Sequence, residues 1–296
     1  MKGDKASGGL QRCAEEECHA KHDNPRSKYA KAYLNLKEDE TPISQQVRQG
    51  VLDKGELLVI KPIMYDANIS ALKQENELWR CFCYVENLAK NSLPGSVASD
   101  RFEKIKKMKT KSAKAQAIGA ALLLLYGLGH AGVDPLTETI GYSQHGKALL
   151  VNRSDVRFNL SHSGEHVLLT LADFELGCDV QQKLPNRSGV AHRFYEEKEL
   201  AQMQASDDRE DTFFRIWTAK ESYIKWLGLG MAKDLRTFFV DLKRQQIYDK
   251  EKSAWTAAIF EAQSPSYRTA VCAIMEDKEK LSGMTVKNLV IEDLME

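Results

Sequence analysis

The chain has 296 residues, of which 43% are hydrophobic and 28% are charged. This composition is normal for a soluble globular protein, and the length allows one large domain or two smaller ones with a sizeable core. Basic and acidic residues balance at 42 each, so the formal net charge is zero. A general nucleic-acid binder usually carries a basic excess, so the balance disfavours that class of protein.

Residues 1–76 differ from the rest of the chain, and we predict that they form an N-terminal extension. They are mostly polar and charged, with one short apolar patch at Leu57–Ile63. Potential zinc ligands lie close together near the start of this region: Cys13, Cys18, His19 and His22. Their spacing fits no standard zinc finger, so a flexible extension is favoured over a metal site.

The sequence predicts no targeting or membrane-spanning segment. The segment Met1–Leu10 lacks the apolar core of a signal peptide. The longest apolar run, Ala117–Leu128, is too short to cross a bilayer. The cysteines do not follow the pattern of a secreted disulfide framework. We therefore expect a cytoplasmic protein.

Residues 77–178 are predicted to form a first half of mixed α and β structure. The expected elements are a strand at Trp79–Val85, a long helix over Arg101–Tyr126 and a half-buried strand over Val156–Leu160. The helix starts with a basic run, Arg101–Lys114, and then becomes apolar on all sides. Its second part should therefore be buried.

Residues 179–296 are predicted to form a second half. A hairpin of Val167–Ala172 and Leu176–Gln181 leads into it, because a short turn separates two apolar runs. Two helices and three strands are expected to follow: Val190–Met203 and Asp211–Leu227 as helices, and Thr237–Leu242, Trp255–Phe260 and Tyr267–Ile274 as strands. This order favours an α+β fold with meander-like strands over uniform βαβ units.

Acidic and basic side chains recur at spacings that suit a metal and phosphate site. On a strand, Asp179 and Gln181 would point to one face, away from their apolar neighbours. If Trp217–Lys225 is helical, Glu221 and Lys225 lie on one helix face. Carboxylates can hold Mg²⁺ or take a proton, and an ammonium can neutralise phosphate. From spacing alone, an edge-strand acid and an ordinary surface ion pair are the more frequent outcome.

Other segments could contact an anion. Asn159–Gly164 offers hydroxyls, an imidazole and turn amides that can bind phosphate oxygens, although a plain Ser/His turn is common. Gly146 and Lys147 lack the rest of a P-loop. The basic run Arg101–Lys114 could meet an acidic partner, although a solvated helix face is the more common outcome.

The order and spacing of these motifs together resemble the 4′-phosphopantetheinyl transferases of the Sfp type. The resemblance covers about residues 78–285 and is strongest from Gln144 to Met231. It is carried by five segments: Gln144–Lys147, Phe158–Ser163, Gly177–Val180, Ala191–Tyr195 and Trp217–Lys225, the last followed by Gly228 and Gly230.

The resemblance implies two similar α+β halves in a pseudo-twofold arrangement, with coenzyme A and Mg²⁺ in the cleft between them. The implied reaction moves the 4′-phosphopantetheine group of coenzyme A onto a serine of an apo acyl or peptidyl carrier protein and releases 3′,5′-ADP. Because carrier proteins commonly have an acidic surface, the basic run becomes a candidate docking site.

The family motifs also imply roles for individual residues. Asp179, Gln181 and Glu221 would lie at the metal. Glu221 and Lys225 would be catalytic: the carboxylate would help deprotonate the serine, and the ammonium would hold the pyrophosphate. Coenzyme A would be bound by four residues: Lys147, Ser161, His162 and Lys225.

Two departures from the family pattern leave an alternative open. Gln181 stands where many relatives have Glu, and a neutral amide is a weaker Mg²⁺ ligand than a carboxylate. Ala115, beside Lys114, stands where many relatives carry an arginine. The alternative is a non-catalytic relative that binds coenzyme A or a carrier protein. In both cases we expect a monomer, because one chain supplies both halves, and no nucleic-acid or membrane partner.

Overall fold

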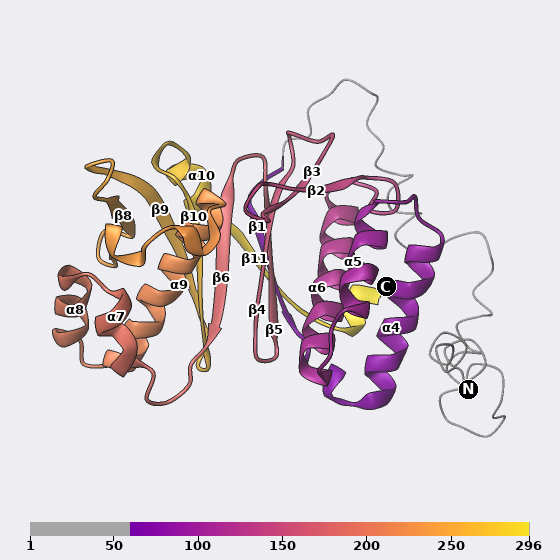
Figure 1. Cartoon of the computed structure of the whole chain (residues 1–296), viewed down its shortest axis with the longest axis horizontal. Helices are drawn as coiled ribbons and strands as arrows, with labels where there is room; N and C mark the ends of the chain where they lie inside the picture. The colour runs from indigo at the N-terminus through magenta and orange to yellow at the C-terminus, as the bar shows by residue number, and fades with distance from the viewer. Residues whose placement is uncertain (1–59, 296) are drawn as a thin grey trace, which may run out of the picture.

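The computed structural model describes residues 60–295. Figure 1 shows two α+β halves side by side, each with a sheet toward the centre and helices on the outside. The fold class predicted from the sequence, α+β, is confirmed.

The first half contains a four-stranded sheet with the order β11-β1-β5-β4. Its strands are β1 (Ile63–Asn68), β4 (Arg157–Ser163), β5 (His166–Ala172) and β11 (Thr285–Val290). Helix α6 (Lys111–His130) packs on this sheet, and α4 (Glu75–Lys90) and α5 (Val97–Lys106) pack on α6. A two-stranded hairpin, β2 (Ile140–Tyr142) with β3 (Ala148–Leu150), follows α6 in the chain.

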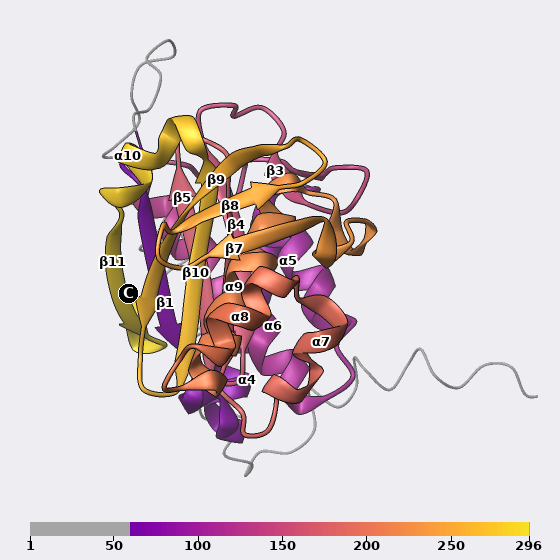
Figure 2. The same cartoon turned by 90° about the vertical axis from the view of Figure 1, so that its left-hand side faces the viewer.

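The second half contains a five-stranded sheet with the order β6-β10-β9-β8-β7. Its strands are β6 (Leu176–Gln182), β7 (Phe238–Asp241), β8 (Gln246–Asp249), β9 (Ala254–Gln263) and β10 (Tyr267–Ile274). Its helices are α7 (Ala191–Phe194), α8 (Glu197–Gln204), α9 (Arg209–Leu227) and α10 (Lys278–Ser282). Helix α9 packs across β6 and β10, and the rotated view in Figure 2 shows it beside β10.

Side-chain alternation along the strands decides which residues face which layer. In β5, Leu169 packs against the helices of the first half, whereas Leu168 packs between the two sheets. In β6, Cys178 and Val180 also pack between the sheets. Asp179 therefore points to the opposite face, toward α9, as the strand motif predicts.

Helix α9 is fixed at both ends and pressed closely against β6. The Asp208 side chain caps its first turn. Gly228 ends it in the left-handed conformation, with φ of 67°. At Gly177 on β6, an added Cβ would lie 2.2 Å from the oxygen of Ser222 and from the nitrogen of Trp226. Only glycine allows this close approach, which brings the last turn of α9 against β6, the strand that carries Asp179.

Helix α6 is the central helix of the first core. By length and composition it could cross a membrane, but 61% of its most apolar window is buried inside the structure. Its residues Ile118–Leu125 are all buried, so the prediction that the apolar part of this segment is buried is confirmed.

Two predictions for the first half are wrong. Trp79–Val85 belongs to α4 rather than to a strand, because the buried residues Cys81, Val85 and Leu88 follow helical spacing. The predicted long helix is two helices, α5 and α6, and Thr110 caps the second. The lysines of the basic run therefore do not share one helix face.

The predicted domain boundaries also need correction. Residues 63–68 form β1 inside the first sheet, so the extension ends well before residue 77. Residues 285–290 form β11, which runs parallel to β1 and so returns to the first half. The predicted hairpin does not form, because β5 pairs with β1 and β4 while β6 pairs with β10. Residues 1–59, with the potential zinc ligands, lie outside the described residues.

Candidate active site

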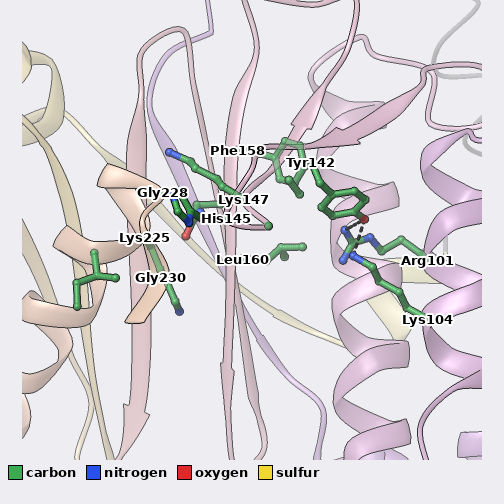
Figure 3. Close-up of a pocket in the computed structure, with 14 residues that line it drawn as sticks. Arg101, Lys104, Tyr142, His145, Lys147, Phe158, Leu160, Lys225, Gly228 and Gly230 are labelled. Atoms are coloured by element: carbon green, nitrogen blue, oxygen red, sulfur yellow. Dashed lines mark hydrogen bonds between the residues drawn. The ribbon is translucent and has the colours of Figure 1, made fainter. Parts of the chain in front are cut away.

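A cleft of about 290 Å³ is lined by residues of both halves. The first half contributes Arg101 and Lys104 from α5, and the second half contributes Lys225 and Gly228 from the end of α9. Figure 3 shows Arg101 and Lys104 gathered at Tyr142 on one side, with Lys225 on the other side. Cationic groups therefore border the cleft on two sides, which suits an anionic ligand.

Asp179, Ser161 and Lys225 form one hydrogen-bonded group where β4, β6 and α9 meet. Ser161 Oγ donates to Asp179 Oδ1 at 2.7 Å. Lys225 Nζ donates to the same carboxylate oxygen at 2.7 Å and to Ser161 Oγ at 2.8 Å. The amide of Val180 also donates to Ser161 Oγ, at 3.3 Å. The Ser161 hydroxyl therefore donates one hydrogen bond and accepts two, all within the protein. Its predicted contact with coenzyme A stays a prediction.

The second oxygen of Asp179, Oδ2, is buried and has no hydrogen-bond partner. A buried carboxylate oxygen of this kind normally requires a cation, a water molecule or a donor. Glu221 lies nearby on α9 and is half-buried. Burial raises the pKa of Glu221, and the Asp179 carboxylate raises it further, against the opposing effect of Lys225. The Glu221 carboxyl therefore senses the charge of Asp179, and a cation shared by the two stays a prediction.

Charge at Lys225 is maintained by Asp179. Burial alone would lower the pKa of Lys225, but the neighbouring carboxylate outweighs this effect and the pKa is raised. The side chain keeps 30% of its surface exposed. His162 is exposed on β4, and partial dehydration together with Lys225 lowers its pKa. At neutral pH the site therefore contains a charged ammonium, on Lys225, and a neutral imidazole, on His162.

The described residues, 60–295, contain no group of three or more His, Cys, Asp or Glu side chains placed to hold a metal ion. The site offers a smaller oxygen set: the unpaired Asp179 Oδ2, the Glu221 carboxylate and the half-buried Gln181, which shares a face of β6 with Asp179. Mg²⁺ typically takes one or two carboxylates and completes its shell with phosphate oxygens and waters. The oxygen set fits that ion, and these ligands stay a prediction.

Lys147 lines the cleft, but protein groups occupy its ammonium. Nζ donates to the Glu175 carboxylate at 2.8 Å, to the carbonyl of Leu176 at 3.3 Å and to the carbonyl of Trp226 at 3.1 Å. These bonds tie the β2–β3 hairpin to the start of β6 and the end of α9. A contact between this ammonium and coenzyme A also stays a prediction.

Arg101 and Lys104 form a second cationic group in the cleft. Lys104 Nζ donates to the Tyr142 hydroxyl at 2.5 Å, and that hydroxyl donates to Asp100 Oδ2 at 2.5 Å. The Nε of Arg101 is buried and has no hydrogen-bond partner. Burial and Arg101 lower the pKa of Lys104, although Asp100 opposes them. One acid faces two cations here, so a bound anion would be stabilised.

The basic run as a whole predicts a docking surface, and its sequence does not distinguish Arg101 and Lys104 as cleft residues. Their spacing of three residues, which places them on one face of α5, was the available signal. Lys106 and Lys107, by contrast, are exposed. Tyr142 belongs to none of the motifs, and only the tertiary structure brings it to the site.

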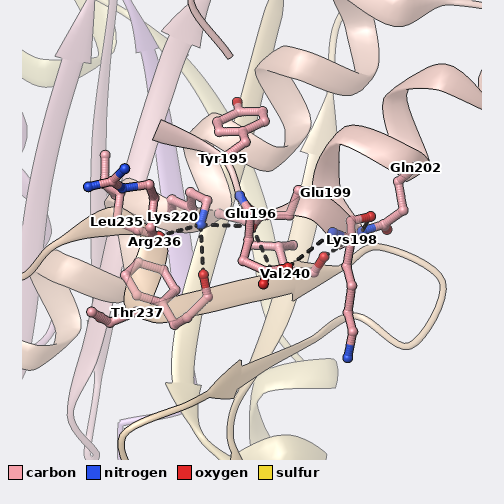
Figure 4. Close-up of polar contacts among 12 residues, drawn as sticks. Tyr195, Glu196, Lys198, Glu199, Gln202, Lys220, Leu235, Arg236, Thr237 and Val240 are labelled. Atoms are coloured by element: carbon pink, nitrogen blue, oxygen red, sulfur yellow. Dashed lines mark hydrogen bonds and ion pairs between the residues drawn. The ribbon is translucent and has the colours of Figure 1, made fainter. Parts of the chain in front are cut away.

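A fully buried ion pair joins α9 to α8, as Figure 4 shows. Lys220 Nζ lies 2.8 Å from Glu199 Oε1, and both side chains are 0% exposed. The ammonium also donates to the carbonyls of Leu235 and Phe238, at 2.8 and 3.0 Å. Glu199 Oε1 accepts the amide of Val240 in β7 at 2.8 Å. Burial lowers the pKa of Lys220 and raises that of Glu199, and each partner opposes the other's shift.

Comparison with known proteins agrees with this geometry. A sequence model of the 4′-phosphopantetheinyl transferase superfamily matches residues 175–273. A 4′-phosphopantetheinyl transferase of Bacillus subtilis is 30% identical over 151 residues, which cover 50% of this chain and 67% of that protein. The 4′-phosphopantetheinyl transferase gsp of Aneurinibacillus migulanus is 25% identical over 210 residues, covering 69% and 86%. For AcpT of Escherichia coli K12 the identity is 38% over 101 residues, covering 32% and 51%. With Asp179, Glu221 and Lys225 inside the region that the superfamily model matches, the chain belongs to the 4′-phosphopantetheinyl transferase superfamily and is an enzyme of the transferase class.

Proposed function

We propose that this enzyme transfers the 4′-phosphopantetheine group of coenzyme A to a serine of an apo acyl or peptidyl carrier protein and releases 3′,5′-ADP. A new bond forms between the serine Oγ and the phosphorus that carries pantetheine, while the bond from that phosphorus to the departing nucleotide breaks. The observation that carries the proposal is the Asp179–Lys225 ion pair, because Lys225 lines the cleft and the second oxygen of Asp179 is buried without a hydrogen-bond partner.

Asp179 and Glu221, with Gln181 as a weaker third group, would hold Mg²⁺. When bound there, the ion supplies Lewis-acid neutralisation of charge on the pyrophosphate oxygens. The support for this assignment is the oxygen set itself, since Asp179 Oδ2 is buried without a partner. Gln181 contributes no charge, so the site would carry two acidic ligands rather than three.

Lys225 and Glu221 have distinct roles in the proposed reaction. The Lys225 ammonium would stabilise the negative charge that develops on the departing nucleotide phosphate, and its raised pKa keeps it charged. Glu221 would take the proton of the attacking serine, directly or through a water. A base with a pKa raised toward the operating pH is better suited to that transfer.

The cationic pair Arg101 and Lys104 would bind a phosphate of coenzyme A on the first-half side of the cleft. The Nε of Arg101 makes no hydrogen bond and lies 3.5 Å from Asp100 Oδ2, the one carboxylate that both cations face, and this imbalance of charge around Tyr142 supports the role. The exposed, neutral His162 could donate a hydrogen bond to the same ligand. These groups would supply the first-half contacts that Ala115 cannot make.

The carrier protein would dock on exposed lysines that follow the cleft pair in sequence. Lys106, Lys107 and Lys109 are all exposed, and Lys106 has one acidic neighbour, Glu103, at 2.5 Å. Such a surface attracts an acidic partner and raises its association rate. We also propose that the protein is a monomer, because both halves of the cleft come from one chain. Its proposed location is the cytoplasm.

A direct test is to incubate the protein with coenzyme A, Mg²⁺ and several apo carrier proteins, and to weigh each carrier by mass spectrometry. The expected result is a mass gain of one phosphopantetheine group, which a chelator abolishes and added Mg²⁺ restores. Binding of coenzyme A or carrier without any mass gain would instead support a non-catalytic relative.

The cleft cations and the exposed lysines should affect different substrates. Replacing Arg101 and Lys104 by Gln should raise the KM for coenzyme A at least tenfold, about 1.4 kcal/mol, because two phosphate contacts are lost. Reversing Lys106, Lys107 and Lys109 to Glu should raise the KM for the carrier and its dependence on salt. Steady-state kinetics with each substrate varied in turn measures both effects.

The two variants control for each other. The glutamine variant should leave the KM for the carrier within about twofold of wild type, and the charge-reversal variant should do the same for coenzyme A. An unchanged KM for coenzyme A in the first variant would remove the phosphate assignment. An unchanged KM for the carrier in the second would remove the docking assignment.

A further inference from the structure

The two sheets meet along β4 and β6 without forming a common ladder. Each of these strands is the edge of its own sheet, and the two adjoin in the centre of Figure 1. Because β6 pairs with β10 on one side, every second amide of β6 points away from β10. Amides on such an edge need an acceptor from elsewhere when they are buried.

Side chains on alternate positions of β4 accept these amides. Asn159 Oδ1 accepts from Cys178 at 3.0 Å, Ser161 Oγ from Val180 at 3.3 Å, and Ser163 Oγ from Gln182 at 3.0 Å. We call these three bonds the seam. In the seam, side-chain oxygens stand where carbonyl oxygens would stand in a continuous sheet, so the two strands are joined but kept a side chain apart.

Two hydrogen bonds of the seam flank Asp179 in the sequence of β6. This residue lies between Cys178 and Val180, whose amides form the first two bonds of the seam. Ser161, the middle member, also donates to Asp179 itself and belongs to the active site. Asn159 lines the cleft, whereas Ser163 does not. The Ser163 Oγ bonds to β6 three residues beyond Asp179.

The placement of Asp179 matters because residues of both halves line the cleft, and the halves pack on each other through buried side chains between the two sheets, among them Leu168, Cys178 and Val180. Arg101 and Lys104 are carried by the first core, whereas Asp179, Glu221 and Lys225 are carried by the second. A ligand held by both groups is aligned only if the halves keep one fixed offset. A displacement of about 1 Å can reduce a reaction rate about 100-fold.

We propose that Asn159 and Ser163 are positioning residues, which fix β6 against β4 and thereby align Asp179 with the first-half phosphate site. The inference rests on the proposed function for its effect on catalysis. The seam itself can be tested without any substrate, because removing an acceptor exposes one named amide to exchange with solvent.

The experiment compares Ser163→Ala with Ser163→Thr by amide hydrogen exchange of the apo protein and by steady-state kinetics. In Ser163→Ala the Gln182 amide should exchange about tenfold faster, as expected for loss of one hydrogen bond. The kcat should fall while the KM for coenzyme A stays within about twofold. Ser163→Thr keeps the hydroxyl and should restore both the protection and the kcat.

Two further variants make the result specific. Asn159→Leu removes the acceptor at similar size, and the Cys178 amide should become the faster one. Ser206→Ala removes a hydroxyl at the far end of α9 that accepts from the Asp208 amide at 3.2 Å and from Thr212 Oγ1 at 2.7 Å and donates to the Asp208 carbonyl at 3.1 Å. Although it loses more bonds than Ser163→Ala, it should leave the kcat unchanged.

The inference is overturned if the Gln182 amide keeps its protection in Ser163→Ala. It is also overturned if Ser163→Ala and Ser163→Thr lower the kcat equally, or if faster exchange leaves the kcat at the wild-type value. Failure of the proposed function would look different: the wild-type protein itself would transfer nothing to any carrier. In that case the exchange of the Gln182 amide in the apo protein, which needs no substrate, still tests the seam.

Discussion

Asp179→Asn is expected to lower the kcat for carrier modification by at least about 100-fold, because charge stabilisation at the reacting phosphate is lost. The amide keeps the size of the side chain and can still accept from Ser161 and Lys225. It removes the negative charge that the proposed Mg²⁺ and the Lys225 ammonium both require. Quantitative mass spectrometry of the carrier over time measures the effect.

The same substitution has a second readout that does not depend on turnover. Burial lowers the pKa of Lys225 and Asp179 raises it, so removing the carboxylate should shift that pKa downward. Nuclear magnetic resonance of the lysine side chain during a pH titration follows this change. A variant that loses activity and keeps an unshifted Lys225 would contradict the ion pair.

Asp173→Asn is the matched control for this experiment. It makes the same chemical change in the β5–β6 connection, where the side chain is 30% exposed and lies 4.0 Å from Lys280. Its kcat should stay close to wild type, because exposed ion pairs contribute little. If Asp179→Asn retained more than a tenth of wild-type activity, the central role of Asp179 would be wrong.

Lys220→Met is expected to destabilise the folded protein by about 3–5 kcal/mol. The substitution leaves Glu199 charged and 0% exposed without its partner. It also removes the donor to the carbonyls of Leu235 and Phe238. Unfolding in urea, followed by circular dichroism, measures the loss.

A double-mutant cycle separates the ion pair from general packing. Glu199→Gln removes the charge and keeps an oxygen for the Val240 amide, so the double variant with Lys220→Met should lose less stability than the two single changes added together. Lys250→Met is the control, because Lys250 pairs with Glu196 at the surface, where its side chain is 46% exposed. It should change stability by less than about 1 kcal/mol. Additive losses in the cycle would show that the pair contributes nothing as a pair.

Local pattern was sufficient for some parts of the fold and misleading for others. The strand β10 and the helix α9 were predicted within about a residue or two of their ends, the usual margin for boundaries, because alternation and caps act within a few residues. Trp79–Val85 has the aromatic and β-prone composition of a strand, but the segment packs against α5 and α6, where burial requires helical spacing. The β1–β11 pair joins the two ends of the described region, and no window of neighbouring residues contains both strands.

The candidate site divides in the same way. Asp179, Glu221 and Lys225 were found from motifs because strand alternation and the helical repeat place side chains by short-range geometry. The sequence pattern places Arg101 and Lys104 on the surface, because their partner Tyr142 comes from a remote segment. The hydrogen bonds of the Lys147 ammonium could not be predicted from the sequence either, since its acceptors Glu175, Leu176 and Trp226 lie beside or in β6 and at the end of α9.

The sequence by itself determined the α+β class, the family resemblance and the identity of the acidic and basic groups at the centre of the site. Those properties follow from residue type and from periodicities that span only a few residues. The tertiary structure alone decided that β6 lies beside β4 rather than β5, that the cleft has cations on both sides, and that serine and asparagine oxygens join the halves. These features depend on contacts between segments far apart in the chain, whose geometry is set by how whole layers pack.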